Sequence, residues 1–544
     1  MSSNPPPARV EALVIGAGFG GMYMLHRLRG LGIPAHVVEA GDDVGGTWYW
    51  NRYPGARCDV ESMQYSYSFD EELQQSWSWS ERFAAQPEIL SYARHVADRL
   101  GLRRDISFST RVTAARFDEA AGRWTIETSD KQRISARIVI LATGCLSSAR
   151  LPDIEGIERF KGRVLHTGEW PHESVDFGDQ RVGVVGTGSS AIQAIPVIAE
   201  QAEQLTVFQR TPNFSIPSRN AAMDELYEAS WKNGYAARRQ AARLMRTGIL
   251  YDLNPQSALE VSAEEREAEY ERRWAAGGTA FMAAFSDLLL DKAANDTAAE
   301  FVRSKIRAMV RDPAVAEALA PTSHPIGTKR ICVDTRYYET FNRPNVRLVD
   351  VRKSPIVRVT EAGIQAGGEH HAFDSIVYAT GFDAMTGTIL AMDIQGRDGI
   401  SMRQVWADGP RTLLGLMTAG FPNMFMITGP GSPSVLSNMI VSIEQHVDWI
   451  ARLLAHMVRE GQGLVEATQA AQDDWVAHVN EVAHRTLYPQ ANSWYMGANV
   501  PGKPQLFMPY VGGVGTYRQA CDRIAAEGYP GFRFGGVREA AAAE

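Results

Sequence analysis

Two clusters of glycines in this chain have the spacing of a loop that binds phosphate. In the first, Gly16, Gly18 and Gly21 follow a short apolar run and precede a stretch with helical character. Glycines at this spacing let the backbone turn sharply and approach a pyrophosphate at the N-terminus of the helix. An acid about 20 residues further on can bind the hydroxyls of a ribose, and Glu39 stands at that place. This segment predicts a site for the ADP half of a dinucleotide.

The second cluster has alanine, an accepted variant, at the third fingerprint position, Ala191. Here Arg210 follows the second apolar run, where the first unit has Glu39. A guanidinium binds a 2′-phosphate that a carboxylate would repel, so the unit predicts NADP rather than NAD. The alternative is that Arg210 is an ordinary exposed arginine at a strand end. The residues expected to hold the diphosphate or the 2′-phosphate are Thr187, Gly188, Ser189, Ser190, Gln193, Arg210, Thr211 and Lys329.

Two dinucleotide sites in one chain predict FAD and NADPH, which exchange a hydride that protein side chains cannot supply. A disulfide reductase would need a pair of closely spaced cysteines near the flavin. The four cysteines, Cys58, Cys145, Cys332 and Cys521, contain no such pair. Molecular oxygen is therefore the favoured electron acceptor by elimination.

The elements that must position these turns are two strand–turn–helix–strand units. The first is expected over residues 12–39 and the second over 182–209. Residues 217–326 are rich in Ala, Glu and Arg, and 298–310 shows helical periodicity. The predicted fold class is α/β, with two Rossmann-like dinucleotide-binding domains and a mostly helical insertion. The expected division is FAD-binding domain 1–147, NADP-binding domain 148–216, helical insertion 217–326, NADP-binding domain 327–381 and FAD-binding domain 382–544.

Composition excludes several classes of protein. The chain has 544 residues, 45% of them hydrophobic and 22% charged, with a net charge of −8. This is a globular composition without the basic surface of a nucleic-acid partner. No apolar run reaches the roughly 20 residues of a membrane helix, and no signal peptide or metal-binding motif is present. We expect a cytoplasmic monomer or weak homo-oligomer with no metal, nucleic-acid or membrane partner.

Between the two units lies a further motif. The pattern F-x-G-x-x-x-H-T-x-x-W-P is filled by Phe160, Gly162, His166, Thr167, Trp170 and Pro171. It resembles the signature of type I Baeyer-Villiger monooxygenases. The segments 46–59 and 374–381 resemble the family's G-x-W-x-x-x-x-[FY]-P-G-x-x-x-D and D-x-x-x-x-A-T-G patterns. Together with familiar segments near residues 327–330, 429–439 and 492–495, the resemblance covers almost the whole chain.

The resemblance implies an activity. In this family, reduced flavin and oxygen form a C4a-peroxyflavin whose anion attacks a ketone, and the adduct rearranges to an ester or lactone. Arg330 matches the family's catalytic arginine, and Asp59 is expected to lie beside it and to steer its conformation. From the residues alone, a plain ion pair that only holds two domains together stays open.

Further roles come from the same resemblance. His166 is expected to hold the hinge between the nucleotide domains rather than to act as a base. Trp48 and Tyr65 are expected to pack on the flavin. The remaining positions assigned to cofactor binding are Gly46, Thr47, Asp59, Val112, Met439 and Trp494.

A ketone pocket is expected where relatives have theirs. Its residues are Val60, Cys145, Leu146, Ser434, Val435, Leu436 and Met439. Cys145 and Val435 depart from a glutamine and an alanine at these places in one member of the family, a difference expected to change the polar contacts and the shape of the cavity. The predicted substrates are aryl and cyclic ketones, and sulfides in addition.

Three alternatives remain. A flavin-containing N- or S-monooxygenase shares both glycine fingerprints, but its motif lacks the ending that Trp170 and Pro171 provide. A non-oxygenating NADPH-flavin oxidoreductase would not need Arg330. A binding protein without catalysis is possible on the same fold.

Overall fold

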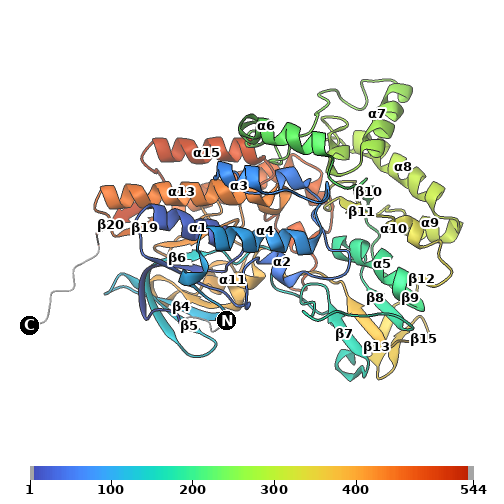
Figure 1. Ribbon diagram of the computed structural model, residues 1–544, viewed down its shortest axis with the longest axis horizontal. Helices are drawn as coiled ribbons and strands as arrows, with labels where there is room; N and C mark the ends of the chain where they lie inside the picture. Colours follow the sequence, from blue (N-terminus) through green and yellow to red (C-terminus); the bar gives the residue numbers. More distant parts are fainter. Residues whose placement is uncertain (1–4, 537–544) are drawn as a thin grey trace, which may run out of the picture.

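The computed structural model describes residues 5–536. Two parallel-rich β-sheets lie next to each other, each with helices packed on it, and a group of helices covers one end of the molecule (Figure 1). Each sheet carries one of the two glycine turns. The fold class predicted from the sequence, α/β with Rossmann-like units, is confirmed.

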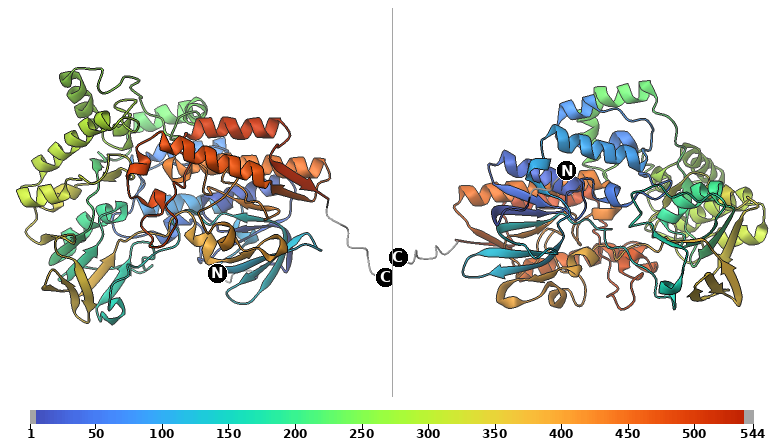
Figure 2. Two further views of the ribbon diagram at one scale, coloured as in Figure 1. Left: turned by 180° about the vertical axis from the view of Figure 1, so that it is seen from behind. Right: turned by 60° about the horizontal axis from the view of Figure 1, so that its bottom comes forward.

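The first sheet has eight strands in the order β17-β4-β5-β6-β1-β2-β3, with β18 paired to β6. The strands β1 and β2 pair in parallel, and their apolar residues are buried, as expected for a sheet covered on both faces. Two distant parts of the chain build this sheet (Figure 2). Its strands are β1 Arg9–Ile15, β2 Ala35–Val38, β3 Ile106–Ser107, β4 Val112–Asp118, β5 Arg123–Thr128, β6 Arg133–Leu141, β17 Asp393–Gln395 and β18 Met424–Met426.

The second sheet has five strands, all parallel, in the order β12-β9-β8-β16-β7. Its strands are β7 Arg163–His166, β8 Arg181–Val185, β9 Gln204–Gln209, β12 Val346–Asp350 and β16 Ser375–Tyr378. Smaller sheets are formed by β10 Ser215–Pro217 with β11 Cys332–Asp334, by β13 Ile356–Thr360, β14 Gly363–Ala366 and β15 Glu369–Ala372, and by β19 Leu464–Ala467 with β20 Phe532–Gly535.

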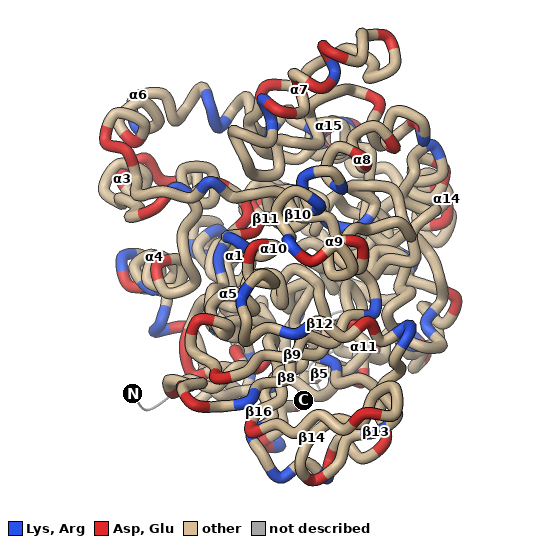
Figure 3. Tube along the Cα trace, turned by 90° about the vertical axis from the view of Figure 1, so that its right-hand side faces the viewer, with Lys and Arg blue, Asp and Glu red and all other residues tan. Residues whose placement is uncertain are grey.

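The helices fall into groups by position. Those of the first unit are α1 Phe19–Gly30, α2 Thr47–Trp50, α3 Glu71–Ser76, α4 Gln86–Arg99, α11 Gly387–Ala391, α12 Met402–Val405, α13 Met439–Arg459, α14 Gln469–His484 and α15 Val514–Ala526. Those of the second unit are α5 Ser189–Gln201 and α10 Tyr337–Thr340, and between β10 and β11 come α6 Glu225–Ala242, α7 Ala263–Ala276, α8 Lys292–Met309 and α9 Pro313–Leu319. In the view of Figure 3, acidic and basic residues are interspersed over α7, α8 and α9.

No helix within residues 5–536 is long and apolar enough to cross a membrane. Over the same residues, no group of three or more His, Cys, Asp or Glu side chains could hold a metal ion. The cysteines Cys58, Cys145, Cys332 and Cys521 are all free and buried.

Candidate active site

The first glycine turn joins β1 to α1 and has no room for side chains. Gly16 has φ +107°, and a Cβ there would lie 2.6 Å from the carbonyl oxygen of Ala142. A Cβ on Gly21 would lie 1.8 Å from the carbonyl oxygen of Gly16. Gly18 is the N-cap of α1 and has no side chain to cap the first amides of the helix. The turn therefore has the uncapped helix N-terminus and the close backbone packing that a pyrophosphate site needs.

Glu39 follows β2 beside this turn and is 5% exposed. Its carboxylate accepts hydrogen bonds from the amides of Ala17 at 2.6 Å and of Gly41 at 2.7 Å. Burial raises the pKa of Glu39, and the two amide hydrogen bonds oppose that effect. The amide of Thr110 binds the Glu39 carbonyl at 2.8 Å, which places Val112, at the start of β4, near the same sheet edge.

The next motif packs onto the same turn. A Cβ on Gly46, which has φ +53°, would lie 2.8 Å from Cα of Gly18. Thr47 begins α2, and the buried indole of Trp48 donates its Nε1–H to the Tyr65 hydroxyl at 3.2 Å. Burial raises the pKa of Tyr65, so this hydroxyl stays protonated. The structure thus brings Gly46, Trp48 and Tyr65 to the first nucleotide turn.

The second glycine turn joins β8 to α5. Gly186 has φ +114°, and a Cβ there would lie 2.5 Å from the carbonyl oxygen of Ala379. A Cβ on Gly188, by contrast, would meet open space at the N-cap of α5. The hydroxyl of Thr187 donates to the carbonyl of Thr211 at 2.9 Å, which ties the turn to the end of β9. Ser189 and Ser190 form the first turn of α5.

Two cations lie near the end of β9. Arg210 is exposed, and Lys329 is half-buried with its ammonium donating to the carbonyl of Asn492 at 2.6 Å. Burial lowers the pKa of Lys329, and the positive charge of Arg210 lowers it further. An anion placed between two such cations would relieve their repulsion. The arrangement fits the predicted 2′-phosphate site.

Arg330 and Asp59 form a two-point ion pair. Nε and Nη2 of Arg330 donate to the two carboxylate oxygens of Asp59, each at 2.8 Å, and Nη1 donates to the carbonyl of Val435 at 2.8 Å. The guanidinium has five N–H groups, so these three bonds leave two uncommitted. The Arg330 side chain is 34% exposed and that of Asp59 is 14% exposed. The charge of Asp59 raises the pKa of Arg330, so the arginine is a permanent cation.

An apolar cluster lies beside this pair. Cys145 and Val435 are buried in it, and Leu146, Leu436, Met439 and Trp494 pack against it. The Cys145 thiol donates to the carbonyl of Thr428 at 3.1 Å and lies 3.0 Å from the hydroxyl of Ser434. Ser434 begins a short 3-10 helix with φ +41°. Val60 is buried in a different cluster, directly after Asp59.

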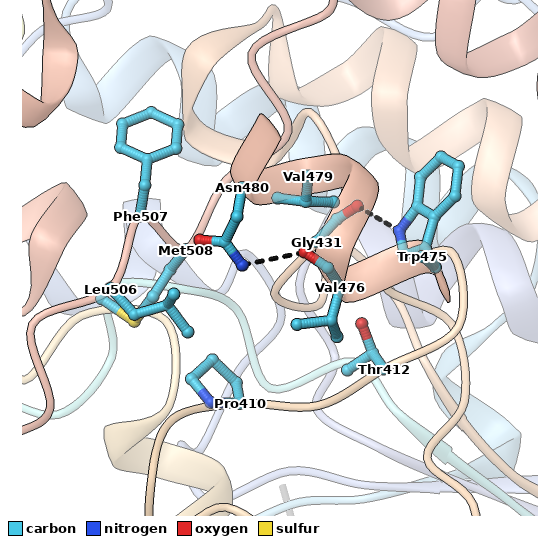
Figure 4. Close-up of a pocket in the computed structure, with 10 residues that line it drawn as sticks. All are labelled: Pro410, Thr412, Gly431, Trp475, Val476, Val479, Asn480, Leu506, Phe507 and Met508. Carbon is cyan, nitrogen blue, oxygen red and sulfur yellow. Dashed lines mark hydrogen bonds between the residues drawn. The ribbon is translucent and has the colours of Figure 1, made fainter. Parts of the chain in front are cut away.

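Helix α14 forms a hydrogen bond with the loop that carries Ser434. Trp475 donates its Nε1–H to the carbonyl of Gly431 at 3.0 Å, as Figure 4 shows. The cavity drawn there, between this loop and Leu506, has a volume of about 10 Å³. Such a volume holds about one water molecule and no ketone, so this cavity is not the substrate site.

The central motif lines the second sheet. A Cβ on Gly162 would lie 2.5 Å from the carbonyl oxygen of Asp374, and β7, which ends at His166, pairs with β16. Nδ1 of His166 accepts the Gly168 amide at 3.0 Å, and burial lowers the pKa of His166. Within residues 5–536, the buried Thr167 hydroxyl has no hydrogen-bond partner.

The flanks of this motif are also buried. Phe160 packs in the cluster around β16, and Trp170 packs 6.2 Å from Phe177 in the core of the second unit. Pro171 directly follows Trp170 and is half-buried. Both ends of the motif are therefore packed in the second unit. Nδ1 of His166 accepts the Gly168 amide, so the neutral ring has no other lone pair with which to take up a proton, which fits the predicted hinge role.

Sequence reasoning missed several contacts of the site. The carbonyl of Val435 holds Arg330, and the carbonyl of Asn492 holds Lys329. Every residue has a carbonyl, so no sequence signal marks these two. The carbonyl of Thr428, which accepts the Cys145 thiol, was missed for the same reason.

Comparison with known proteins agrees with this geometry. Residues 13–234 match the model of the family described as pyridine nucleotide-disulphide oxidoreductase. A Baeyer-Villiger monooxygenase from Pseudooceanicola batsensis is 43% identical over 526 residues, which cover 96% of each chain. The structure of an oxidised steroid monooxygenase bound to NADP is 52% identical, with a TM-score of 0.93 over 97% of this chain and 99% of that one.

The structure of OTEMO in complex with FAD and NADP is 40% identical, with a TM-score of 0.93, and the match covers 97% of this chain and all of that one (100%). The match thus spans nearly the whole of this chain. The chain belongs to the type I Baeyer-Villiger monooxygenase family.

Proposed function

We propose that this chain is an NADPH- and O2-dependent flavoprotein monooxygenase that converts ketones to esters or lactones. The observation that carries the proposal is Arg330, a permanent cation beside an apolar cluster, with two N–H groups that have no partner among residues 5–536. Family membership and the FAD and NADP in related structures support it.

The two glycine turns fit the two dinucleotides. Gly16 and Gly21 have no space for a Cβ, while Gly188 has open space in front of a helix N-terminus. The turn at Gly16 with Glu39, Gly46, Trp48 and Tyr65 would hold FAD. The turn at Gly186, with residues 187–190, Arg210, Thr211 and Lys329, would hold NADP. When bound, FAD supplies the transfer of electrons from NADPH to oxygen.

The protein residues then have defined tasks. Arg330 presents two N–H groups that can bind an anionic oxygen without giving up a proton. Asp59 fixes the guanidinium plane through two hydrogen bonds, and the carbonyl of Val435 fixes its rotation. The apolar side chains around Cys145 would exclude water and hold the hydrocarbon part of the ketone.

Several finer points belong to the same proposal. We propose the division FAD domain 1–147 and 382–544, NADP domain 148–216 and 327–381, and helical insertion 217–326, because it follows the two sheets and the helices between β10 and β11. Aryl and cyclic ketones and sulfides are the proposed substrates. A cytoplasmic location and a monomer or weak homo-oligomer remain our predictions.

The test is product analysis with the FAD-loaded protein. Purified enzyme, NADPH and air-saturated buffer are incubated with cyclohexanone, phenylacetone and a thioether, and esters, sulfoxide and hydrogen peroxide are quantified against NADPH consumed. Ester formed in near-equal amount to NADPH supports the proposal. If each NADPH oxidised yields one hydrogen peroxide from oxygen and no ester with any ketone, the proposal is wrong and the chain is an NADPH oxidase.

A further inference from the structure

One side chain of helix α5 binds a segment from the other nucleotide unit. Gln193 lies one helical turn after Ser190. Its Oε1 accepts the hydroxyl of Tyr53 at 2.8 Å and, at a longer 3.4 Å, the amide of Arg57. Its Nε2 donates to the carbonyl of Arg57 at 3.0 Å. The oxygen and the nitrogen of the Gln193 side-chain amide therefore both form hydrogen bonds with the segment 53–57.

The backbone of this segment also lies directly on α5. Gly55 has φ +81°, and a Cβ there would be 2.4 Å from the carbonyl oxygen of Gln193. Tyr53 and Ala56 are buried in the hydrophobic core of the second unit, together with Ile192 of α5. Although it belongs to the first part of the chain, the segment is packed as part of the second unit.

The opposite edge of the segment is fixed to the first unit. The amide of Cys58 donates to the carbonyl of Ala84 at 3.1 Å, and the carbonyl of Ala56 accepts the amide of Gln86 at 2.9 Å. Arg57 binds the carboxylate of Glu81 at 2.5 Å. The segment 53–59 thus connects the two units, and it ends at Asp59, which holds Arg330 through both carboxylate oxygens.

We propose that Gln193 is a positioning residue that couples the second nucleotide helix to Asp59 and, through Asp59, to Arg330. The inference rests on the proposed function for its catalytic consequence, because Arg330 acts there on the reacting oxygens. A shift of α5 relative to the first sheet moves the anchor of the segment that carries Asp59. An error of about 1 Å in such a position can cost roughly 100-fold in rate.

Positioning of Asp59 by Gln193 differs from the binding of the nucleotide by the same side chain. The Gln193 amide has two N–H groups, and one of them is used by the carbonyl of Arg57. The other can still reach a diphosphate, so the two roles have to be separated by measurement. Binding to the nucleotide alone would affect the affinity for NADP. Positioning of Asp59 would affect kcat and the ratio of ester to hydrogen peroxide, even when NADPH is saturating.

The experiment uses the FAD-loaded full chain with Gln193→Leu, Gln193→Glu and Tyr53→Phe. Leucine removes every hydrogen bond to the segment, glutamate keeps only the acceptor, and Tyr53→Phe removes one donor while it preserves the buried ring. Gln201→Leu, at the exposed C-terminal end of α5, is the matched control. Four quantities are measured for each variant: the Kd for NADP+, kcat at saturating NADPH, the ratio of ester to hydrogen peroxide, and amide hydrogen exchange over residues 53–59.

We expect Gln193→Leu to lower kcat by roughly 10- to 100-fold and to shift product from ester to hydrogen peroxide. Exchange over 53–59 should become faster, while the Kd for NADP+ changes by less than about threefold. Tyr53→Phe and Gln193→Glu should give smaller changes of the same kind, and Gln201→Leu none. A raised Kd with kcat, product ratio and exchange unchanged would overturn the positioning role. If the wild type forms no ester, the proposed function fails, while hydrogen exchange still tests the coupling by itself.

Discussion

Arg330 and Asp59 meet through two parallel hydrogen bonds of 2.8 Å, and the same guanidinium is held by the carbonyl of Val435. A lysine in place of Arg330 would keep the charge but lose this fork. We predict that Arg330→Lys and Arg330→Ala lower ester formation by about 100- to 1,000-fold, the loss seen when a donor to a reactive oxyanion is removed.

NADPH oxidation should continue in both Arg330 variants, because neither glycine turn is changed. Its product should then be hydrogen peroxide, measured beside the ester in the same reaction. Ester formation at the wild-type rate in Arg330→Lys would show that charge alone suffices. The same result in Arg330→Ala would show that the ion pair with Asp59 only holds the two units together.

The glycine turns show what can be predicted from sequence alone. Gly16 and Gly186 adopt φ +107° and +114° and leave no room for a Cβ, so the fold needs glycine locally and the pattern reveals it. The strand–turn–helix–strand unit expected over 12–39 is found as β1, α1 and β2, and α1 begins at Phe19, so that Gly20 and Gly21 form part of its first turn.

The contacts of Arg330 and Lys329 were not predictable in this way. They use the backbone carbonyls of Val435 and Asn492, which are far away in sequence and chemically like every other carbonyl. The hydrogen bond between Gln193 and Tyr53 likewise depends on how the two units pack together. Sequence patterns predict local backbone conformation well. They do not predict contacts between residues far apart in the chain, unless the sequence resembles a family in which those contacts are known.

Gly188 and Gly21 are predicted to respond differently to alanine. Gly188 has φ −81° and open space, so Gly188→Ala should change stability by less than about 1 kcal/mol, because the lower chain entropy of alanine is offset by its weaker preference for the N-cap. The new methyl would instead meet the dinucleotide, and overpacking of about 1–3 kcal/mol corresponds to a rise of roughly 5- to 150-fold in the Kd for NADP+. Calorimetric titration and thermal unfolding measure the two effects.

In Gly21→Ala the added Cβ would collide with the Gly16 carbonyl at 1.8 Å, so this variant should lose bound FAD or unfold. Gly30→Ala, at the open end of α1, is the control for the substitution itself.

An unchanged Kd for NADP+ in Gly188→Ala would argue against a pyrophosphate at the N-terminus of α5.

Arg210 and Lys329 should set the preference for NADPH. Each charged hydrogen bond to a 2′-phosphate is worth about 1.5–3 kcal/mol, so Arg210→Ala or Lys329→Ala should lower kcat/KM for NADPH by roughly 10- to 150-fold. NADH has no 2′-phosphate, and its kcat/KM should stay within about threefold. Arg347→Ala, an exposed arginine of β12 paired with Glu369, is the control. Equal losses with NADPH and NADH would place these cations elsewhere on the dinucleotide.

Acid should destabilise the protein through His446. This histidine is fully buried on α13, its Nδ1 accepts the amide of Thr428 at 2.8 Å, and burial lowers its pKa to about 3. Unfolded histidine binds a proton near pH 6.5, so between pH 6.5 and 3 the unfolded state holds one proton more than the folded state. Stability is therefore present above pH 6.5 and falls as the pH is lowered, by up to about 1.4 kcal/mol per unit.

Several buried acids with raised pKa, among them Glu444 and Glu39, act in the opposite direction, so a difference between variants is needed. Glutamine in place of His446 can still accept the Thr428 amide but does not titrate. Between pH 7 and pH 5 the wild type should lose about 2 kcal/mol more in free energy of unfolding than His446→Gln, as measured by urea denaturation at the two pH values. His484→Gln, at the exposed end of α14, should track the wild type. Parallel pH profiles for His446→Gln and the wild type would mean that His446 does not stay neutral in the folded protein.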